Sequence, residues 1–550
     1  MEFKKNQIVE LYIDDIGNEG EGIGHIDGYA LFLKDAVIGD KVRAKIIKTK
    51  KNYGFARVEE VIEASKDRVQ PRCSKARQCG GCTLQHLAYE KQLEYKFNKV
   101  KNCLERIGGL ENIEEKMEPI LGMEEPFYYR NKAQFPVGYD KEGNLITGFY
   151  AGRTHHIIDC THCMIQHPVN EQILLKVLDY MKKNNITAYD EKTHKGLVRH
   201  IVTRVGFKTG EIMVCLVVNG SKKNLRNLEM LVDSLTEIEG MTSICVNINK
   251  EKTNRILGSK IEEVYGKPYI YDYIGNVKYQ IGPLSFFQVN PTQTKVLYEK
   301  AMEYADLKGE EIVWDLYCGI GTISLFLAQK AKKVYGVEIV KEAIDDARLN
   351  AKMNGFDNAE FFVGKAEEVL PREYEKNGVY ADTIVVDPPR KGCDSKLLET
   401  MVKMAPKRIV YVSCDPATLA RDLKVLSEQG YEVEKVCAVD QFSHSSHVET
   451  VVLLSKGMVD SRKVKVDFSL EDMDLSEFKG KATYEQIKAY VLEETGLKVS
   501  SLYIAQIKKK CGLDVGENFN PAKSENARQP QCTPEKEDAI MQAFSHFGII

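Results

Sequence analysis

The sequence predicts an α/β protein in which a small OB-like β-barrel and a β-rich central domain accompany a Rossmann-like, doubly wound domain. Short alternating runs separated by glycine turns fill residues 1–62, as in five-stranded barrels. Strand patterns continue to about residue 280. From about residue 282 strands alternate with helices, which is typical of a parallel doubly wound sheet. A small helical extension follows residue 457.

Length and composition set the outer bounds. A chain of 550 residues is too long for one hydrophobic core, so several domains are expected. The sequence shows neither a signal peptide nor an apolar run of roughly 20 residues. We therefore expect a cytoplasmic monomer with no membrane partner. The 14 cysteines are then candidates for metal binding or catalysis rather than disulfides, and a net charge of −3 gives no global nucleic-acid signal.

The barrel carries a predicted RNA-binding face. The stretch from Lys41 to Val58 contains no acidic residue, and Tyr53 and Phe55 lie among its cations. Cations bind phosphates and aromatic rings stack on bases, so this pattern favours RNA binding. The alternative is a solvated strand edge whose lysines discourage aggregation. The cations are Lys41, Arg43, Lys45, Lys48, Lys50, Lys51 and Arg57.

A cysteine cluster follows the barrel. Cys73, Cys79 and Cys82 have the spacing C-x5-C-G-G-C, in which two glycines tighten the turn so that the thiols can converge. Zinc and iron–sulfur clusters both accept thiolates, and the cysteine-only set with this spacing favours [4Fe–4S]. A fourth ligand must come from elsewhere, and Cys160 and Cys163 are the nearest candidates. The alternative is a group of buried free thiols.

Residues 84–125 are expected to be rich in helix, and residues 127–280 in strands. Arg130 and Lys132 stand among amides and aromatic residues at the start of this strand-rich part. They are candidates for RNA contact, although a strand entry with a solvated face explains the same pattern.

The doubly wound domain contains a predicted nucleoside pocket. Its first strand, residues 312–314, leads into Gly319 and Gly321, which let the backbone approach a ligand at the start of a helix. A lone Gly-x-Gly is weak evidence. Glu338 ends the next strand, 19 residues after Gly319, where an acid can bind ribose hydroxyls. S-adenosylmethionine and a dinucleotide fit equally here, and the rigid Asp-Pro-Pro loop that begins at Asp387 favours a methyltransferase.

Cys414 is the candidate nucleophile. It follows the apolar strand 409–412 and precedes a helix over residues 416–429, and a cysteine at a helix N-terminus is expected to have a lowered pKa. A thiolate that adds to a pyrimidine ring makes the neighbouring carbon nucleophilic enough to accept a methyl group. The target base must leave any helical stack to reach such a pocket. The alternative for Cys414 is a small buried hydrophobic residue.

Together these motifs resemble the bacterial 23S rRNA (uracil-5-)-methyltransferase family over about residues 5–456, including a TRAM domain that matches residues 20–24 and 37–42. The resemblance implies that Cys414 is the nucleophile and that Glu449, in a His-x-Glu segment, is the general base. It also implies a [4Fe–4S] cluster whose fourth ligand is Cys163, because that cysteine follows a stretch like the family's Arg…Ile-Val-Asp, here Arg153 and residues 157–159. Its S-adenosylmethionine-binding positions fall on Gln288, Tyr317, Glu338 and Asp387.

The expected domains follow from these assignments. Residues 1–62 form the TRAM-like barrel, and residues 63–92 with 126–280 form the central β-rich domain with the iron–sulfur motif. Residues 93–125 with 281–457 form the methyltransferase domain. Residues 458–550 form a helical extension of unassigned role, with two helical patterns joined as in a helix-turn-helix.

The expected activity is the formation of 5-methyluridine in large-subunit rRNA, a step of rRNA processing. A tRNA substrate is the nearest alternative, but the relatives that act on tRNA generally lack the barrel and the cysteine cluster. RNA cytosine-5 enzymes carry a cysteine directly after the Asp-x-Pro loop, and amino-group methyltransferases an aromatic residue; this chain has Arg390 there. The intact nucleophile and base argue against a non-catalytic RNA-binding assembly factor.

Overall fold

The computed structural model describes residues 3–152, 154–457, 483–513, 532–547 and 549. Two compact units make up the chain, Met1–Met458 and Val459–Ile550. Arg153 and, within the expected helical extension, residues 458–482 and 514–531 lie outside the described residues. No helix within the described part of the chain is both long and apolar enough to cross a membrane.

The N-terminal module is a six-stranded sheet in the order β1-β5-β6-β4-β3-β2. It has one strand more than the five expected, because the two-residue strand β2 is too short to leave a pattern in the sequence. Alternate residues of β4 and β5 are fully buried and form its core, as a sheet with one buried face requires. The strands are β1 (Ile8–Tyr12), β2 (Asp15–Ile16), β3 (Gly22–Ile26), β4 (Tyr29–Lys34), β5 (Lys41–Thr49) and β6 (Tyr53–Glu63).

The central part is a seven-stranded sheet in the order β10-β9-β8-β11-β12-β13-β14. Every residue of β11 and β12 is buried, in keeping with the continuous apolar run seen in β12. The elements are β8 (Lys132–Tyr139), β9 (Leu145–Tyr150), β10 (Ile157–Asp159), α2 (Val169–Lys183), β11 (Val198–Val205), β12 (Ile212–Val218), the 3₁₀ turn η2 (Lys222–Asn224), α3 (Leu228–Thr236), β13 (Met241–Ile248) and β14 (Lys260–Gly266).

The third sheet confirms the doubly wound fold. Its eight strands run in the order β19-β18-β17-β20-β21-β23-β22-β7, and the five from β19 to β21 are parallel. The strands are β7 (Met117–Leu121), β17 (Ile312–Leu316), β18 (Lys333–Glu338), β19 (Ala359–Val363), β20 (Thr383–Val386), β21 (Arg408–Ser413), β22 (Tyr431–Val439) and β23 (Glu449–Lys456).

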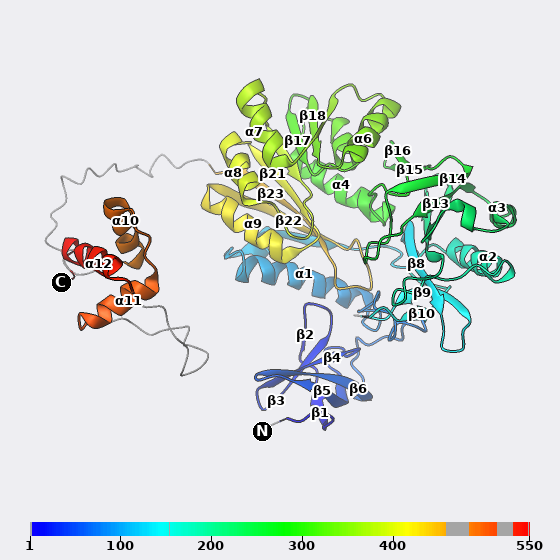
Figure 1. Cartoon of the computed structure of the whole chain (residues 1–550), viewed down its shortest axis with the longest axis horizontal. Coiled ribbons are helices and arrows are strands. Elements are labelled where there is room, and N and C mark those ends of the chain that lie inside the picture. Colours follow the sequence, from blue (N-terminus) through cyan, green and yellow to red (C-terminus); the bar gives the residue numbers. More distant parts are fainter. Residues whose placement is uncertain (1–2, 153, 458–482, 514–531, 548, 550) are drawn as a thin grey trace. The chain divides into compact units, whose positions relative to one another are not determined.

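Helices cover both faces of this sheet (Figure 1). Helices α4, α5 and α6 share a core with one face, and α1, α7, α8 and α9 share a core with the other. The remaining elements are α1 (Tyr89–Arg106), η1 (Ile113–Lys116), α4 (Pro291–Ala305), α5 (Thr322–Ala328), α6 (Lys341–Asn354), α7 (Ala366–Asn377), α8 (Ser395–Met404), α9 (Pro416–Glu428) and the hairpin β15 (Ile270–Ile274) and β16 (Val277–Ile281).

One strand of this sheet comes from an early part of the chain. Strand β7 lies within residues 84–125, where mainly helix was expected, and it pairs in parallel with β22 at the sheet edge. Helix α1, just before it, packs Val100 and Leu104 into the same core as helix α9. Two elements that precede the central sheet in the sequence, α1 and β7, therefore complete the doubly wound domain.

The C-terminal unit contains three helices in its described residues: α10 (Tyr484–Thr495), α11 (Ser501–Lys510) and α12 (Pro534–His546). The first two agree with the helical patterns in the sequence, and α12 was not predicted. Thr483 caps α10 through a capping box with Gln486, which fixes where that helix begins. The unit has a core of its own, made by Ile487, Val491, Ile504, Ile507, Ile540 and Phe544.

Candidate active site

The carboxyl end of strand β17 forms the first wall of a deep pocket. Tyr317 directly follows the strand and has φ +75°, a left-handed conformation that bulky residues rarely adopt. Its backbone NH and that of Cys318 both donate to the Val337 carbonyl (3.0 and 2.9 Å). Because these bonds hold the turn against strand β18, the glycine loop stays open toward the pocket.

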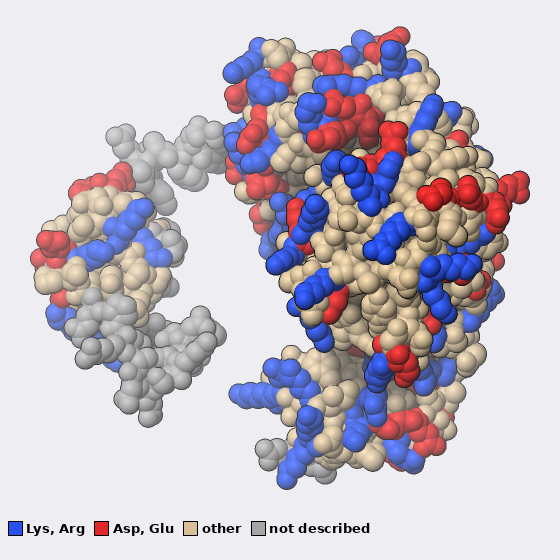
Figure 2. Space-filling model, turned by 45° about the vertical axis from the view of Figure 1, so that its right-hand side comes forward, with Lys and Arg blue, Asp and Glu red and all other residues tan. Residues whose placement is uncertain are grey.

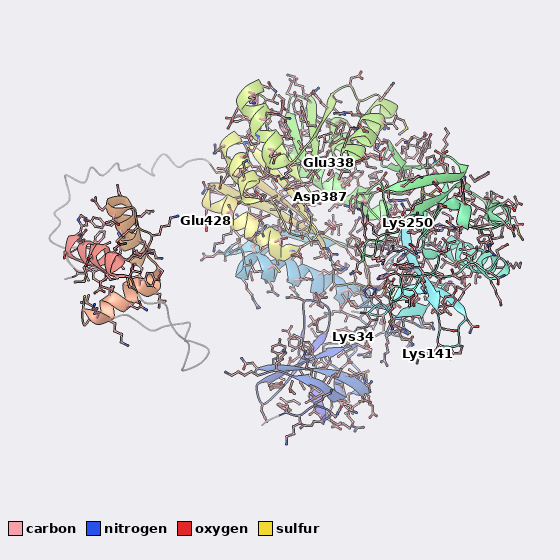
Figure 3. All side chains as sticks on the ribbon, viewed as in Figure 1. Lys34, Lys141, Lys250, Glu338, Asp387 and Glu428 are labelled. Carbon is pink, nitrogen blue, oxygen red and sulfur yellow. The ribbon has the colours of Figure 1, made fainter. Side chains whose placement is uncertain are left out.

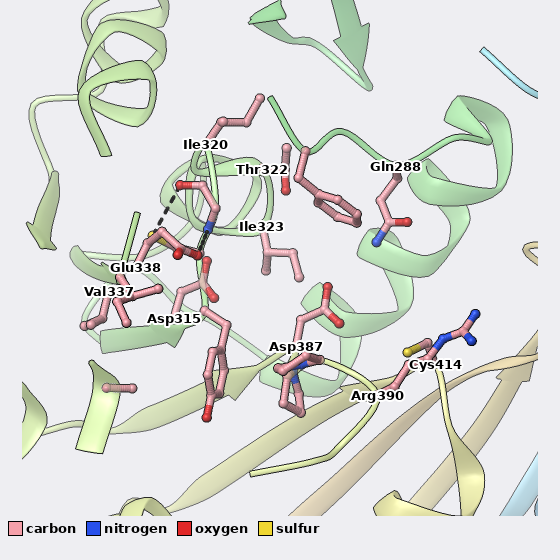
Figure 4. Close-up of a pocket in the computed structure, with 18 of the residues that line it drawn as sticks. Gln288, Asp315, Ile320, Thr322, Ile323, Val337, Glu338, Asp387, Arg390 and Cys414 are labelled. Atoms are coloured by element: carbon pink, nitrogen blue, oxygen red, sulfur yellow. Dashed lines mark hydrogen bonds between the residues drawn. The ribbon is translucent and has the colours of Figure 1, made fainter. Parts of the chain in front are cut away.

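Glu338 closes this end of the pocket. One carboxylate oxygen accepts from the Gly319 NH at 3.3 Å and the other from the Val340 NH at 2.9 Å. The side chain is half-buried and borders the pocket beside Asp315 (Figure 4). An acid held in this way at the end of the second strand can accept hydrogen bonds from a ribose.

Two further acids lie under the glycine loop. Asp315 is fully buried, and burial raises its pKa to about 7, against the lowering effect of the Ser324 hydroxyl, which donates to it at 2.5 Å. Burial, with Asp315 as its neighbour, also raises the pKa of Asp387 to about 7. Near neutral pH both carboxyls are poised between neutral and charged, so a cation in the pocket favours their charged forms.

Cys414 and Glu449 lie at the other end of the pocket. Cys414 follows β21, and Glu449 is the first residue of β23, which pairs antiparallel with β21. Figure 4 shows Gln288 across the pocket from Asp387 and Cys414, with Arg390 beside the cysteine. Burial raises the pKa of Glu449 to about 8, with Asp387 adding to the shift and Arg390 opposing it.

The expected low pKa of Cys414 is wrong for the structure as it stands. Burial raises the pKa of the thiol to about 12, and Glu449 and Asp387 raise it further than Arg390 lowers it. The amides at the start of α9 do not stabilise the thiolate, because Asp415 caps them: its carboxylate accepts from Ala417 NH (2.9 Å) and Thr418 NH (3.2 Å). The start of helix α9 therefore does not lower the pKa of this thiol.

All six residues predicted for catalysis and cofactor binding line this one pocket, which has a volume of about 890 Å³. They are Gln288, Tyr317, Glu338, Asp387, Cys414 and Glu449. Residues that sequence reasoning did not assign to the site also line it, including Asp315, Phe286, Phe442 and His447. Their only signal in the sequence was proximity to a motif.

A buried network holds the segment that carries His447 and Glu449. Lys96 of α1 forms an ion pair with Asp440 at 2.5 Å, and neither side chain is exposed. The same ammonium donates to the Phe442 carbonyl (2.9 Å), and the Tyr89 hydroxyl donates to the other Asp440 oxygen (2.7 Å). Gln92 adds a bond from the His444 NH (2.9 Å). Helix α1 thus fixes the loop between β22 and β23.

Replacing Lys96 with methionine is expected to destabilise the protein by about 3–5 kcal/mol, because Asp440 stays buried without its partner. Urea unfolding of the two proteins measures this loss. Lys101→Met is the matched control, since Lys101 lies on the same helix in a surface pair with Glu114, and such pairs contribute little to stability. Equal losses in both variants would contradict a special role for the buried pair.

A second cavity, of about 390 Å³, brings the cysteine motif together. Cys73, Cys79, Cys82, Cys160 and Cys163 all line it. Burial raises the pKa of Cys82, and the nearby Cys163, Cys79 and Cys73 add to the shift. Cys160 differs, because its thiol donates to the His162 carbonyl at 3.2 Å. No group of three or more His, Cys, Asp or Glu side chains in the described chain is arranged to hold a metal ion.

Arg130 and Lys132, the candidate RNA contacts, line the cysteine cavity, and Arg130 also lines the active-site pocket. Burial, then Arg204 and Arg130, lower the pKa of Lys132 to about 7. This placement differs from a solvated strand entry, because both cations face enclosed space. Asn131, between them, ties the site segment to strand β8 by donating through its side chain to the Gln288 carbonyl at 3.0 Å.

The N-terminal module presents an aromatic and cationic face. Phe32, Tyr53 and Phe55 pack together with ring centroids 5.7–5.8 Å apart on neighbouring strands β4 and β6. Figure 2 shows blue lysine and arginine side chains projecting from this module at the bottom of the view. Of the predicted cations, Lys41, Arg43 and Arg57 form surface ion pairs, whereas among the described residues Lys45, Lys48, Lys50 and Lys51 have no acidic partner.

A doubly wound sheet with a nucleoside-sized pocket at the carboxyl ends of its parallel strands is the architecture that class I methyltransferases share with dinucleotide-binding enzymes. The chain belongs to the tRNA (uracil-5-)-methyltransferase family, whose sequence model matches residues 88–457. A TRAM domain model matches residues 2–58. The protein is therefore an RNA uracil-5-methyltransferase that uses S-adenosylmethionine, which confirms the resemblance drawn from its motifs.

Two curated relatives are described as uncharacterized RNA methyltransferases. The Clostridium tetani protein is 53% identical over 453 residues, which span 82% of this chain and 97% of that one. The Halalkalibacterium halodurans protein is 52% identical over 82% of this chain and 97% of its own. Among solved structures, the Pyrococcus abyssi tRNA (uracil-54, C5)-methyltransferase in complex with S-adenosyl-L-homocysteine is 29% identical with a TM-score of 0.65, covering 81% of this chain and 100% of that one.

Proposed function

We propose that this enzyme forms 5-methyluridine in large-subunit rRNA through a covalent bond between Cys414 and carbon 6 of the target uracil. The observation that carries the proposal is the placement of Cys414 and Glu449 in one pocket with Gln288 and Asp387. A nucleophile and a base at the same end of a nucleoside pocket fit methyl transfer to a carbon that first needs activation. We also propose that the enzyme acts in the cytoplasm as a monomer.

The chemistry divides among these residues as follows. The Cys414 thiol gives its proton to solvent, and the thiolate adds to carbon 6, giving an enolate with electron density at carbon 5. S-adenosylmethionine supplies a positively charged sulfonium whose methyl group carbon 5 takes, leaving S-adenosylhomocysteine. Glu449 then removes the proton from carbon 5, the double bond re-forms and the thiolate leaves. Each bond made to sulfur is broken again, so the enzyme is regenerated.

We assign substrate and donor binding to the remaining pocket residues. Glu338 accepts hydrogen bonds from the donor's ribose, and Tyr317 and Asp387 border the donor. Gln288 reaches into the pocket from the segment before α4, where its amide can hydrogen-bond the flipped base. The cationic and aromatic face of the N-terminal module supplies sequence-tolerant contacts to the RNA backbone and bases.

Transcripts that carry 5-fluorouridine test the substrate and the mechanism together. Fluorine at carbon 5 cannot leave as a proton does, so the enzyme should remain bonded to the RNA and migrate as a shifted band on a denaturing gel. We expect this band with large-subunit rRNA and S-adenosylmethionine. A band with tRNA alone would keep the mechanism and change the substrate. No band with either RNA, despite binding of the donor, would overturn the covalent mechanism.

A tRNA substrate is the second candidate, and one comparison favours it. The Pyrococcus abyssi structure is that of a tRNA (uracil-54, C5)-methyltransferase, and its match covers 81% of this chain and all of that one, so the extent of the match does not separate the two substrates. The cysteine motif, through its resemblance to large-subunit enzymes, supports rRNA. The two arms of the fluorouridine experiment decide between them.

We further propose that Cys73, Cys79, Cys82 and Cys163 hold a [4Fe–4S] cluster. They line one cavity, and Cys163 is favoured over Cys160 because the Cys160 thiol is engaged with a backbone carbonyl. An all-cysteine ligand set suits an iron–sulfur cluster, and such a cluster would link the Cys73–Cys82 segment to Cys163, which line the same cavity.

Donor binding is expected to release protons near neutral pH. Asp315 and Asp387 have pKa values raised to about 7 and Glu449 to about 8, and a bound sulfonium cation favours their carboxylates. Below pH 7 these groups are protonated and neutral, so affinity should rise as pH increases to about 8 and level off above. Calorimetry in buffers of different ionisation enthalpy measures the protons released.

S-adenosylhomocysteine, whose sulfur is neutral, is the matched control for this experiment. Its affinity should change much less over the same pH range, because it brings no charge to the carboxyls. The same pH dependence for both ligands would contradict the electrostatic account and point instead to a titration that affects the adenosine end of the pocket.

A further inference from the structure

Three cations gather around the start of strand β8 without an acidic partner. Lys132 is the first residue of β8, and Arg204 lies directly opposite it on the neighbouring strand β11. Directly opposed residues of an antiparallel pair project from the same face of the sheet. Arg130 precedes Lys132 by two residues. None of the three forms an ion pair with any residue that the structure describes.

The three cations differ in how many uncharged hydrogen-bond acceptors surround them. Arg204 is 2% exposed, and its guanidinium donates to the backbone carbonyls of Ser285 and Pro283. Arg130 Nε donates to the Gln166 side-chain oxygen at 3.2 Å when the amide is oriented so that its nitrogen donates to the Lys132 carbonyl. The Lys132 ammonium has no hydrogen-bond partner among the described residues. Carbonyl and amide oxygens solvate a cation but leave its charge uncompensated, which is costly in an enclosed site.

The unpaired charges lie beside the thiols. Arg130 and Lys132 line the same cavity as Cys73, Cys79, Cys82 and Cys163. Four deprotonated cysteines around an iron–sulfur core form an anion, so this cavity would bring opposite charges together. Chains seldom retain like charges this close unless a ligand neutralises them. RNA phosphate is the other candidate anion, but it accounts neither for the four thiols nor for the burial of Arg204.

We propose that Arg130 and Lys132 supply the positive charge that neutralises the cysteine-bound iron–sulfur cluster. The buried charge of Arg204, opposite Lys132, makes an anion in this cavity still more favourable. This inference rests on the cluster assigned under the proposed function. It also lets the presence of the cluster affect the active site, because Arg130 borders both cavities. An occupied cluster would hold Arg130 toward the cysteines, and a lost cluster would release its charge toward the substrate pocket.

A redox titration of the anaerobically prepared holoprotein, followed by electron paramagnetic resonance, tests the proposal. A nearby cation favours the more negative, reduced cluster, and cluster potentials depend on surrounding charge. Lys132→Met is therefore expected to shift the midpoint potential to more negative values, and Lys132→Arg to leave it near that of the wild type. Lys141→Met, on the exposed turn between β8 and β9 (Figure 3), removes the same charge elsewhere and should leave the potential unchanged.

Thermal unfolding gives a second measurement that does not depend on the potential. Cluster binding should raise the unfolding temperature of the wild type by more than that of Lys132→Met, because the variant has less positive charge for the cluster to neutralise. Comparing cluster-loaded with cluster-free forms of each protein removes any change that the substitution makes to the fold itself. A variant with an unchanged potential and an unchanged gain in unfolding temperature would overturn the proposal.

The outcomes separate this inference from the one on which it rests. Wild-type protein that takes up no iron and sulfide during anaerobic reconstitution would remove both the cluster and its counter-charge, leaving the fluorouridine experiment to decide the methyl-transfer chemistry alone. Wild-type protein with a cluster whose properties are the same in Lys132→Met would keep the cluster and reject the role of Lys132. A variant altered only in the salt dependence of RNA binding would assign the cations to phosphate instead.

Discussion

Replacing Cys414 with alanine is expected to abolish both methyl transfer and the covalent RNA adduct. Without the thiolate, carbon 5 of uracil is too weak a nucleophile to take the methyl group, so the rate should fall by on the order of 10⁴- to 10⁶-fold, as when other catalytic nucleophiles are removed. Transfer of a radiolabelled methyl group measures the rate, and the fluorouridine gel measures the adduct. Donor binding should persist, because Glu338 and the glycine loop remain.

Cys437→Ala is the matched control for this experiment. Cys437 is a fully buried cysteine of strand β22 that does not line the active-site pocket, so its loss costs packing but no chemistry. Loss of methyl transfer in both variants would attribute the effect to the fold. Full activity in Cys414→Ala would show that carbon 5 is activated in another way.

Replacing Glu449 with glutamine is expected to trap the enzyme on ordinary, unfluorinated RNA. The addition of Cys414 and the methyl transfer precede proton removal, so these steps should continue while release slows by about 10²- to 10⁴-fold. A denaturing gel should then show a protein–RNA band that carries the methyl group. Glu428→Gln, at the end of α9, is the control and should turn over normally.

The pH dependence of product release is an independent test of Glu449 as the general base. The pKa of Glu449 is raised to about 8 by burial and Asp387, so below pH 8 most of the enzyme carries the protonated, inactive form. Single-turnover release should therefore quicken about tenfold per pH unit up to about pH 8 and then level off. A flat profile in the wild type, or an unchanged rise in Glu449→Gln, would assign the base to another group.

The convergence of several pocket residues could be predicted from strand order. Glu338 ends β18, Asp387 and Cys414 directly follow β20 and β21, and parallel strands of one sheet end at the same edge. The charge state of Cys414 did not follow, because it depends on Glu449 and Asp387 in three dimensions and on Asp415, which caps the helix. The expectation that a cysteine at a helix N-terminus has a lowered pKa does not take these three neighbouring side chains into account.

Long-range pairs account for the remaining gaps. The ion pair of Lys96 with Asp440 joins residues more than 340 positions apart, and neither residue type stands out in its own segment. Strand β7 is short and half-buried, so nothing local distinguishes it from the helices expected around it. Helix α12 follows a long polar stretch of sequence, and no apolar periodicity before it predicts another helix.

The position of β7 determines when this enzyme can finish folding on the ribosome. Its strand partner in the described part of the chain, β22, begins more than 300 residues later. At 5–20 residues per second, β7 and the apolar face of α1 wait roughly 15–60 s for their partners. During that interval an open strand edge and an uncovered helix face invite the wrong contacts. Nascent chains halted before residue 431 should therefore be held by chaperones, and those that extend past residue 456 should be released.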